Sequence, residues 1–204
     1  MAVEPNTVVT MPALALRGLT IFPNMLLHFD VGRDTSIKAL DQAMSEGLPI
    51  FLVAQRDLSV EEPGQEDLYH IGTISNVKQI LRLPGGNVRV MVEGSSRGRL
   101  LGLSQSAPFL QGEVEYLPVP EHTRNTPKTE ALIRSTYELF ESYAGLSPRM
   151  TGDVLISVLA SDDPGYIADY IAQNIAMRAS DKQGILEELR PVRRLEKLSQ
   201  ALGR

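Results

Sequence analysis

The sequence predicts an α+β fold in which a β-rich first part with one helix precedes an entirely helical second part. Up to residue 118, apolar residues alternate with polar ones or run in short β-branched segments, which is typical of strands. After residue 126, apolar residues recur every three or four positions, as in amphipathic helices. Residues 119–126 show neither period. We therefore expect a β-rich domain over 1–118, a linker over 119–126 and a helical bundle over 127–204.

The first part contains seven strand-like segments and one helical one. A strong turn at Pro84–Asn87 joins two of the strand-like segments into a predicted hairpin. Apolar residues at helical spacing predict a helix that begins with Asp34 or Thr35 as its cap and stops at Gly47. The strand-like segments are residues 8–16, 25–31, 50–54, 71–83, 88–93, 97–103 and 109–117.

The second part shows five helix starts. Three of them pair a capping side chain with proline at the first helical position: Thr126-Pro127, Ser147-Pro148 and Asp163-Pro164. Ser180 and Gln183 have capping-box spacing for a fourth helix. The first of these helices is expected to stop at Gly145. The fifth begins at Pro191, and its apolar stripe still runs at Arg204, so we expect that helix to be truncated and the natural chain to continue.

Composition and charge argue against several classes of protein. The chain has no cysteine and a formal net charge of -5. Neither part is basic, with 9 basic and 13 acidic residues up to 118 and 11 and 12 beyond it. Nucleic-acid binding draws much of its affinity from phosphate neutralisation, so it is unlikely for this chain. No basic signal sequence or bilayer-length apolar run occurs, which predicts a soluble, cytoplasmic protein without a membrane partner.

No motif indicates catalysis, a metal or a cofactor. Residues 94–98 match G-x-S-x-G, but a nucleophile elbow requires a helix after the serine, and strand-like residues follow here. We interpret this segment as a turn between two strands. The three histidines, His28, His70 and His122, are isolated, and no phosphate-binding glycine loop is present. We therefore expect no catalytic, metal or cofactor-binding residue.

A set of short motifs occurs in a fixed order along nearly the whole chain. The motifs are Leu14-Ala15-Leu16-Arg17, Phe22-Pro23, Val31-Gly32-Arg33, Val53-Ala54-Gln55, Leu68-Tyr69-His70-Ile71-Gly72-Thr73, Leu83-Pro84-Gly85-Gly86, Val92-Glu93-Gly94, Asp169, Ile171-Ala172, Lys182-Gln183, Leu186-Glu187 and Arg194-Leu195. This order resembles the N-terminal domain of the Lon family of ATP-dependent serine proteases. The family usually has proline where Ala15 stands and an acidic residue where Gly85 stands, and these departures are expected to affect local stability rather than the fold.

The resemblance implies a PUA-like pseudo-barrel followed by a helical bundle. It further implies a non-catalytic domain for substrate recognition and assembly, within an ATP-dependent serine endopeptidase that works as a homohexamer with ATP and Mg²⁺. The implied partners are unfolded, damaged or degron-tagged proteins and other copies of the parent chain.

A receptor for unfolded proteins needs exposed apolar surface, which predicts two binding loops. We expect Phe22, Pro23, Met25 and Leu26 to form one, and Pro108 with Phe109 to form the other. The alternative is that Phe22 and Leu26 fill the β core. Arg17, Arg33 and Arg97 are expected to make structural hydrogen bonds rather than to contact clients.

Two other functions are compatible with the same fold. The chain could be a stand-alone adaptor with no protease attached, or an RNA-binding module suggested only by the PUA-like architecture. The acidic first part argues against RNA binding.

Overall fold

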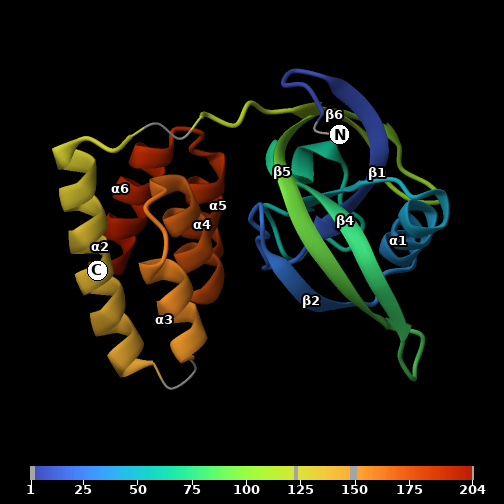
Figure 1. Ribbon diagram of the computed structural model, residues 1–204. Coiled ribbons are helices and arrows are strands. Elements are labelled where there is room, and N and C mark those ends of the chain that lie inside the picture. Colours follow the sequence, from blue (N-terminus) through green and yellow to red (C-terminus); the bar gives the residue numbers. More distant parts are fainter. Residues whose placement is uncertain (1–2, 122–123, 148–150, 204) are drawn as a thin grey trace. The chain divides into compact units, whose positions relative to one another are not determined.

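A computed structural model describes residues 3–121, 124–147 and 151–203, and the chain divides into two compact units, Met1–Val119 and Pro120–Arg204 (Figure 1). The first unit is β-rich with one long helix, and the second is helical. This confirms the predicted α+β class. Within the described residues, no helix is both long and apolar enough to cross a bilayer.

One six-stranded sheet forms the first unit, in the order β2-β5-β4-β3-β1-β6. An additional pairing of β5 with β6 closes five of the strands into a barrel, while β2 lies against the first half of β5. The elements are β1 (Val8–Leu16), β2 (Leu26–Val31), α1 (Asp34–Glu46), β3 (Ile50–Ala54), the 3₁₀ turn η1 (Gln65–Asp67), β4 (Ile71–Arg82), β5 (Val88–Gln105) and β6 (Gln111–Tyr116).

Buried side chains of the first unit form two apolar clusters on opposite faces of the sheet. Successive side chains of a strand point to opposite faces, so β1 supplies both clusters: Leu14 and Leu16 to one, Ala13 and Ala15 to the other. The first cluster includes the buried side of α1 with Leu40. The sheet is therefore anchored on both faces, and its register cannot slip without exposing one cluster.

The long strand β5 replaces the two strands and intervening turn predicted over residues 88–103. It runs without a break from Val88 to Gln105, and the G-x-S-x-G segment lies inside it. Close packing explains the two glycines: a Cβ on Gly94 would lie 2.4 Å from the carbonyl oxygen of Phe22, and one on Gly98 would lie 2.7 Å from Cγ1 of Val114. The predicted turn was therefore wrong, because glycine here permits close approach rather than a bend.

The helix of the first unit begins without the predicted cap. Arg33 occupies the N-cap position of α1, and no side chain accepts a hydrogen bond there, so capping by Asp34 or Thr35 was wrong. The predicted stop is confirmed, since Gly47 adopts a left-handed conformation with φ 64°.

The second unit contains five helices within its described residues. Two predicted starts are confirmed: the hydroxyl of Thr126 accepts from the Thr129 amide, and the carboxylate of Asp163 accepts from the amides of Gly165 and Tyr166. The helices are α2 (Pro127–Leu146), α3 (Gly152–Leu159), α4 (Pro164–Asn174), α5 (Ala179–Glu187) and α6 (Pro191–Leu202).

Two boundary predictions in the second unit differ from the structure, and a third lies partly outside the described residues. Helix α2 continues through Gly145 to Leu146. The start predicted at Ser147-Pro148 involves Pro148, which lies outside the described residues, and the described part of α3 begins at Gly152. Helix α5 begins at Ala179 without a side-chain cap, so the capping box of Ser180 and Gln183 was wrong. Gln183 instead is buried and donates to Glu187.

A buried ion pair joins α4 to α6 in the core of the second unit. Arg194 Nη1 lies 2.9 Å from Asp169 Oδ2, and both side chains are only 6% exposed. Arg194 Nε also donates to the carbonyl oxygen of Glu188 at 2.8 Å. A buried charge is tolerated only when it is paired and hydrogen-bonded, so this cluster orders the turn between α5 and α6.

Candidate functional site

The loop before β2 does not present the apolar surface that the sequence predicted. Phe22 is 0% exposed and Met25 is 4% exposed, and Pro23 is buried with them. The loop is held against β5, since the Asn24 amide donates to Gly94 O at 2.9 Å and the Gly94 amide donates to Met25 O at 2.9 Å. The expected exposure of Phe22, Pro23 and Met25 was therefore wrong. Leu26 is the exception, with 59% of its surface exposed.

The second predicted loop is partly accessible. Pro108 is exposed, whereas Phe109 is half-buried and packs against the apolar cluster that contains Leu40. Both residues face α1 across a shallow cavity of about 360 Å³, whose other lining residues are polar: Lys38, Asp41, Gln42 and Ser45. This second loop therefore offers a small surface that is part apolar and part polar.

Leu26 belongs to a larger exposed surface that sequence reasoning missed, the outer face of β2, β5 and β4. Leu81 is 53% exposed on β4, and Met91 is half-buried on β5. Strand register puts all three on this face, because Leu26 pairs with Glu93 and His28 with Met91, while Arg89 pairs with both Asp30 and Leu81. The two leucines therefore lie on either side of the row that contains Met91. Alternation along these strands was the available signal: inward Val88, Val90 and Val92 imply an outward Met91.

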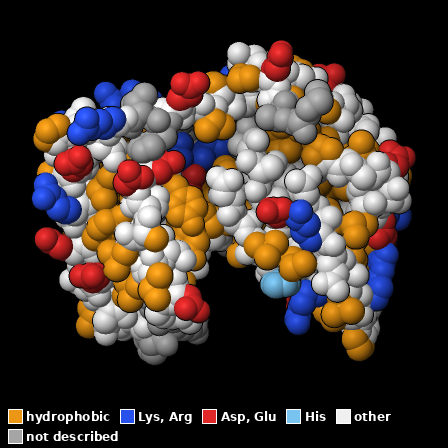
Figure 2. All heavy atoms as spheres, viewed as in Figure 1, with side chains coloured by type: hydrophobic (Ala, Val, Ile, Leu, Met, Phe, Trp, Pro, Cys, Tyr) orange, Lys and Arg blue, Asp and Glu red, His pale blue; other side chains and the backbone are white. Residues whose placement is uncertain are grey.

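Two ion pairs lie on this outer face, in the same rows as the leucines. Arg89 Nε lies 2.7 Å from Asp30 Oδ1, and Lys78 Nζ lies 2.6 Å from Glu93 Oε2. The hydrogen bond from Arg89 holds the pKa of the Asp30 carboxyl below its ordinary value. Figure 2 shows hydrophobic side chains beside a histidine and charged groups over β2. The outer face therefore mixes exposed apolar side chains with ion pairs.

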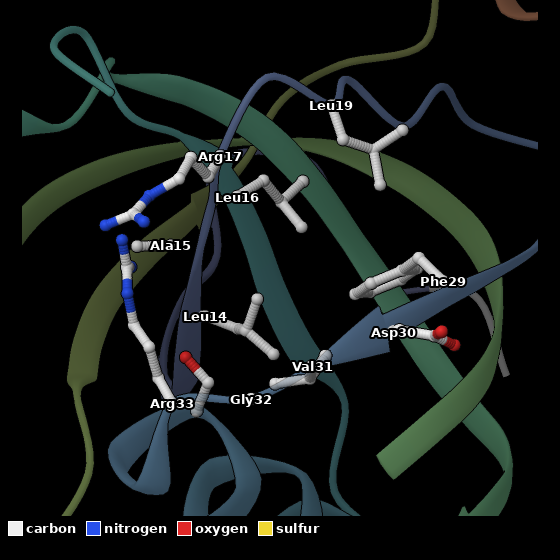
Figure 3. A pocket seen from close by; sticks show the side chains of 11 residues that line it. Leu14, Ala15, Leu16, Arg17, Leu19, Phe29, Asp30, Val31, Gly32 and Arg33 are labelled. Carbon is white, nitrogen blue, oxygen red and sulfur yellow. The ribbon is translucent and has the colours of Figure 1, made fainter. Parts of the chain in front are cut away.

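A groove adjoins this face, between the end of β1 and β2. It has a volume of about 480 Å³ and combines apolar walls with two arginines at one end (Figure 3). Its lining residues are Leu14, Ala15, Leu16, Arg17, Leu19, Phe29, Asp30, Val31, Gly32, Arg33 and Ser36.

Two of the three arginines expected to be structural line this groove. Arg17 Nη2 donates to Val60 O at 3.1 Å. Arg33 Nη2 donates to the side-chain oxygen of Gln55 at 2.5 Å and to Val60 O at 3.3 Å. These bonds confirm that Arg17 and Arg33 make structural hydrogen bonds, and they leave the expectation that neither arginine contacts clients untested. Arg97 is buried in β5.

The described residues contain no arrangement suited to bond cleavage. Ser96 is half-buried within β5, opposite Ile74, with no helix after it. His28 and His70 are both exposed, and His122 lies outside the described residues. Within the part of the chain that the structure describes, no three metal-ligating side chains gather. The outer face and the groove are suited to binding rather than to chemistry.

Residues 10–204 match the model of the ATP-dependent protease La (LON) substrate-binding domain. The chain belongs to this family. It is 42% identical over 189 residues to the Lon protease of Desulforamulus reducens, covering 93% of this chain and 23% of that protein. It is 37% identical over 195 residues to the Lon protease of Escherichia coli, covering 96% and 25%. The chain thus spans about a quarter of the length of these curated relatives, and the resemblance seen in the sequence is confirmed.

Solved structures agree on the fold of this Lon substrate-binding domain. The N-terminal domain of Mycobacterium avium complex Lon protease aligns with a TM-score of 0.76 at 22% identity, covering 96% of this chain and 98% of that one. The Lon N-terminal domain protein from Xanthomonas campestris aligns with a TM-score of 0.66 at 16% identity, covering 93% and 96%. The family description assigns substrate binding to this region, so the segment itself is a non-catalytic domain. The comparisons lend no support to a stand-alone adaptor or an RNA-binding module.

Proposed function

We propose that this chain captures unfolded, damaged or degron-tagged proteins for a Lon-type protease. The parent is a cytoplasmic, ATP-dependent serine endopeptidase, and it works as a homohexamer with ATP and Mg²⁺ acting outside this segment. The family match supports this proposal, together with the alignment over 98% of a solved Lon N-terminal domain.

One observation carries the proposal: two leucines are exposed to solvent on a sheet that already has a buried apolar cluster on each of its faces. Leu26 and Leu81 are more than half exposed although they occupy regular strand positions. Unfolded proteins differ from folded ones in exposing apolar segments, which bury their surface against such a patch. Pro108 and half-buried Phe109 supply a second, smaller contact on the same unit.

The character of the outer face suits many different clients. Met91 has a flexible thioether side chain that adapts to differently shaped partners. The ion pairs Asp30–Arg89 and Lys78–Glu93 stand beside the leucines, which keeps the continuous apolar area small and resists self-association of the free domain. Binding at such a patch is weak and reversible, which fits a receptor that must pass its client onward.

The test replaces Leu26 and Leu81 together by serine. The affinity for a permanently unfolded protein, such as reduced and carboxymethylated α-lactalbumin, is measured by fluorescence anisotropy. We expect binding to weaken roughly tenfold or more, because burying each leucine contributes about 1.5–3 kcal/mol when it is fully covered.

Leu101→Ser provides the matched control, since Leu101 is 47% exposed on β5 and lies outside the outer face. The control should bind as the unchanged chain does. Equal affinities of the double variant and the unchanged chain would show that clients are held elsewhere.

A further inference from the structure

The groove beside the outer face is bounded by two strand edges that lack a neighbouring strand. Residues Ala13–Leu16 of β1 pair with β3 on one side, whereas β6 pairs with the preceding residues Val8–Pro12. The Ala13 amide still donates to Leu110 O at 2.8 Å, so the edge without a neighbouring strand begins at Leu14. Strand β2 pairs with β5 alone. An unpaired edge presents backbone donors and acceptors to any extended chain that approaches it.

Hydrogen bonds to the neighbouring strands show which backbone groups face the groove. The Gln55 amide donates to Leu16 O at 2.8 Å, so the backbone of Leu16 faces β3 and that of Ala15 faces the opposite way. Across the groove, the Gly94 amide donates to Met25 O, so in an alternating antiparallel ladder the backbone of Asp30 points away from β5. Both edges thus have outward-facing peptide groups.

Two arginines stand together at one end of this groove without an acidic partner. Figure 3 shows the guanidinium groups of Arg17 and Arg33 side by side near Ala15. Their acceptors are neutral, namely Val60 O and the amide oxygen of Gln55, and toward the described residues each guanidinium donates through Nη2 alone. Within the described part of the chain, neither arginine forms an ion pair with a carboxylate.

The positive charges of Arg17 and Arg33 repel each other. Partial burial lowers the pKa of Arg33, the charge of Arg17 lowers it further, and Glu61 opposes the effect without pairing with either arginine. Asp30, the acidic residue in the groove lining, already forms an ion pair with Arg89. An incoming carboxylate would neutralise the repulsion, and the planar guanidinium fork is suited to bind its two oxygens.

We propose that the groove binds an extended client segment that carries an aspartate or glutamate, whose side-chain carboxylate accepts hydrogen bonds from Arg17 and Arg33. The segment pairs with the free edges at Ala15 and Asp30, in the manner of strand addition. Its apolar neighbours contact Leu19 and Phe29, which line the same groove. This proposal rests on the proposed function and adds a preference: clients with an acidic residue flanked by apolar ones are favoured.

The test uses two unstructured ten-residue peptides, both acetylated and amidated, which differ only in a central glutamate or glutamine between leucines. Dissociation constants are measured by fluorescence anisotropy at low and moderate salt. The glutamate peptide should bind about tenfold more tightly, because its carboxylate accepts charge-assisted hydrogen bonds that a neutral amide cannot match. The advantage should shrink as salt rises.

Arg17→Gln should abolish the preference, so that the glutamate and glutamine peptides bind this variant with equal affinity. Arg17 is exposed, and one neutral acceptor holds it, so the variant should fold. Arg99→Gln is the matched control, because Arg99 on β5 pairs with Glu115 on β6 and neither residue lines the groove. The Arg99→Gln variant should retain the preference for the glutamate peptide. A preference that survives in Arg17→Gln overturns the proposal.

The two proposals fail in different ways. If both peptides bind the unchanged chain equally, the acidic preference is refuted and the capture of apolar segments stands. If neither peptide binds, both proposals are refuted. Hydrogen exchange adds a readout of position: the Ala15 amide should become protected when the glutamate peptide binds, and an unchanged exchange rate at Ala15 rules out strand addition.

Discussion

At the scale of single residues, exposure and partner chemistry separate binding groups from structural ones. Leu26 and Phe22 lie four positions apart and both are apolar, yet one is 59% exposed and the other 0%. Similarly, the glycines at 94 and 98 resembled part of a catalytic motif, but their function is close packing. A sequence motif does not reveal which atoms will surround a residue after folding.

Replacing Gly94 by alanine should destabilise the first unit by roughly 2–3 kcal/mol. The added Cβ would lie 2.4 Å from Phe22 O, a backbone atom that cannot move without displacing the loop before β2. Unfolding in urea, followed by circular dichroism, measures the change. Gly102→Ala is the control, because its Cβ would approach nothing closer than 3.7 Å. A neutral Gly94→Ala would mean that the loop relaxes freely.

At the scale of elements, caps and turns were predicted with mixed success. Helix starts that combine a capping side chain with proline were correct at Thr126 and Asp163, because both signals are local. The starts of α1 and α5 have no side-chain cap, so the capping residues expected from the sequence do not mark them. In the turn between α5 and α6, Glu188 forms a local ion pair with Arg190 at 2.8 Å, and its carbonyl oxygen accepts from Arg194 Nε.

The ion pair at Glu188 predicts a specific dependence of stability on pH. The hydrogen bond from the Arg190 side chain is the main cause that lowers the pKa of Glu188 from 4.5 to about 2. Because the folded-state pKa is depressed, the stabilisation is complete above pH 4.5 and is lost as pH falls towards 2. We expect Glu188→Gln to cost about 1 kcal/mol at pH 7, since Arg190 is 61% exposed and solvent screens the pair.

Urea unfolding of both proteins between pH 7 and pH 2 measures this effect. The difference in unfolding free energy should converge to zero near pH 2. Glu141→Gln removes an exposed carboxylate from α2 and serves as the control, with little difference expected from the unchanged chain. A difference that persists undiminished at pH 2 would show that Glu188 acts through packing rather than charge.

At the scale of the whole molecule, two units with separate cores predict separable folding. Both buried apolar clusters of the first unit consist of residues before 119, and the ion pair Arg194–Asp169 lies within the second unit. We propose the domain boundaries 1–118 and 127–204, with 119–126 as the linker. A polypeptide of residues 1–119 should therefore fold alone and keep its affinity for unfolded protein.

Limited proteolysis measures this separation directly. Brief digestion with a non-specific protease should cut first within 119–126 and leave two resistant fragments. Circular dichroism of the isolated 1–119 polypeptide should show cooperative thermal unfolding. Rapid degradation of that polypeptide would mean that the second unit is required for the fold of the first.

The sequence by itself determined the fold class, most strands, two helix caps and, through the order of its motifs, the family. These features follow from local periodicity and turn chemistry, which operate over a few residues. Only the tertiary structure decided that Phe22 and Met25 are core, that Leu26 and Leu81 share an outer face, and that Arg17 and Arg33 meet in a groove. The physical reason is that strand register and edge pairing join segments far apart in the chain, and no local pattern encodes which of them meet.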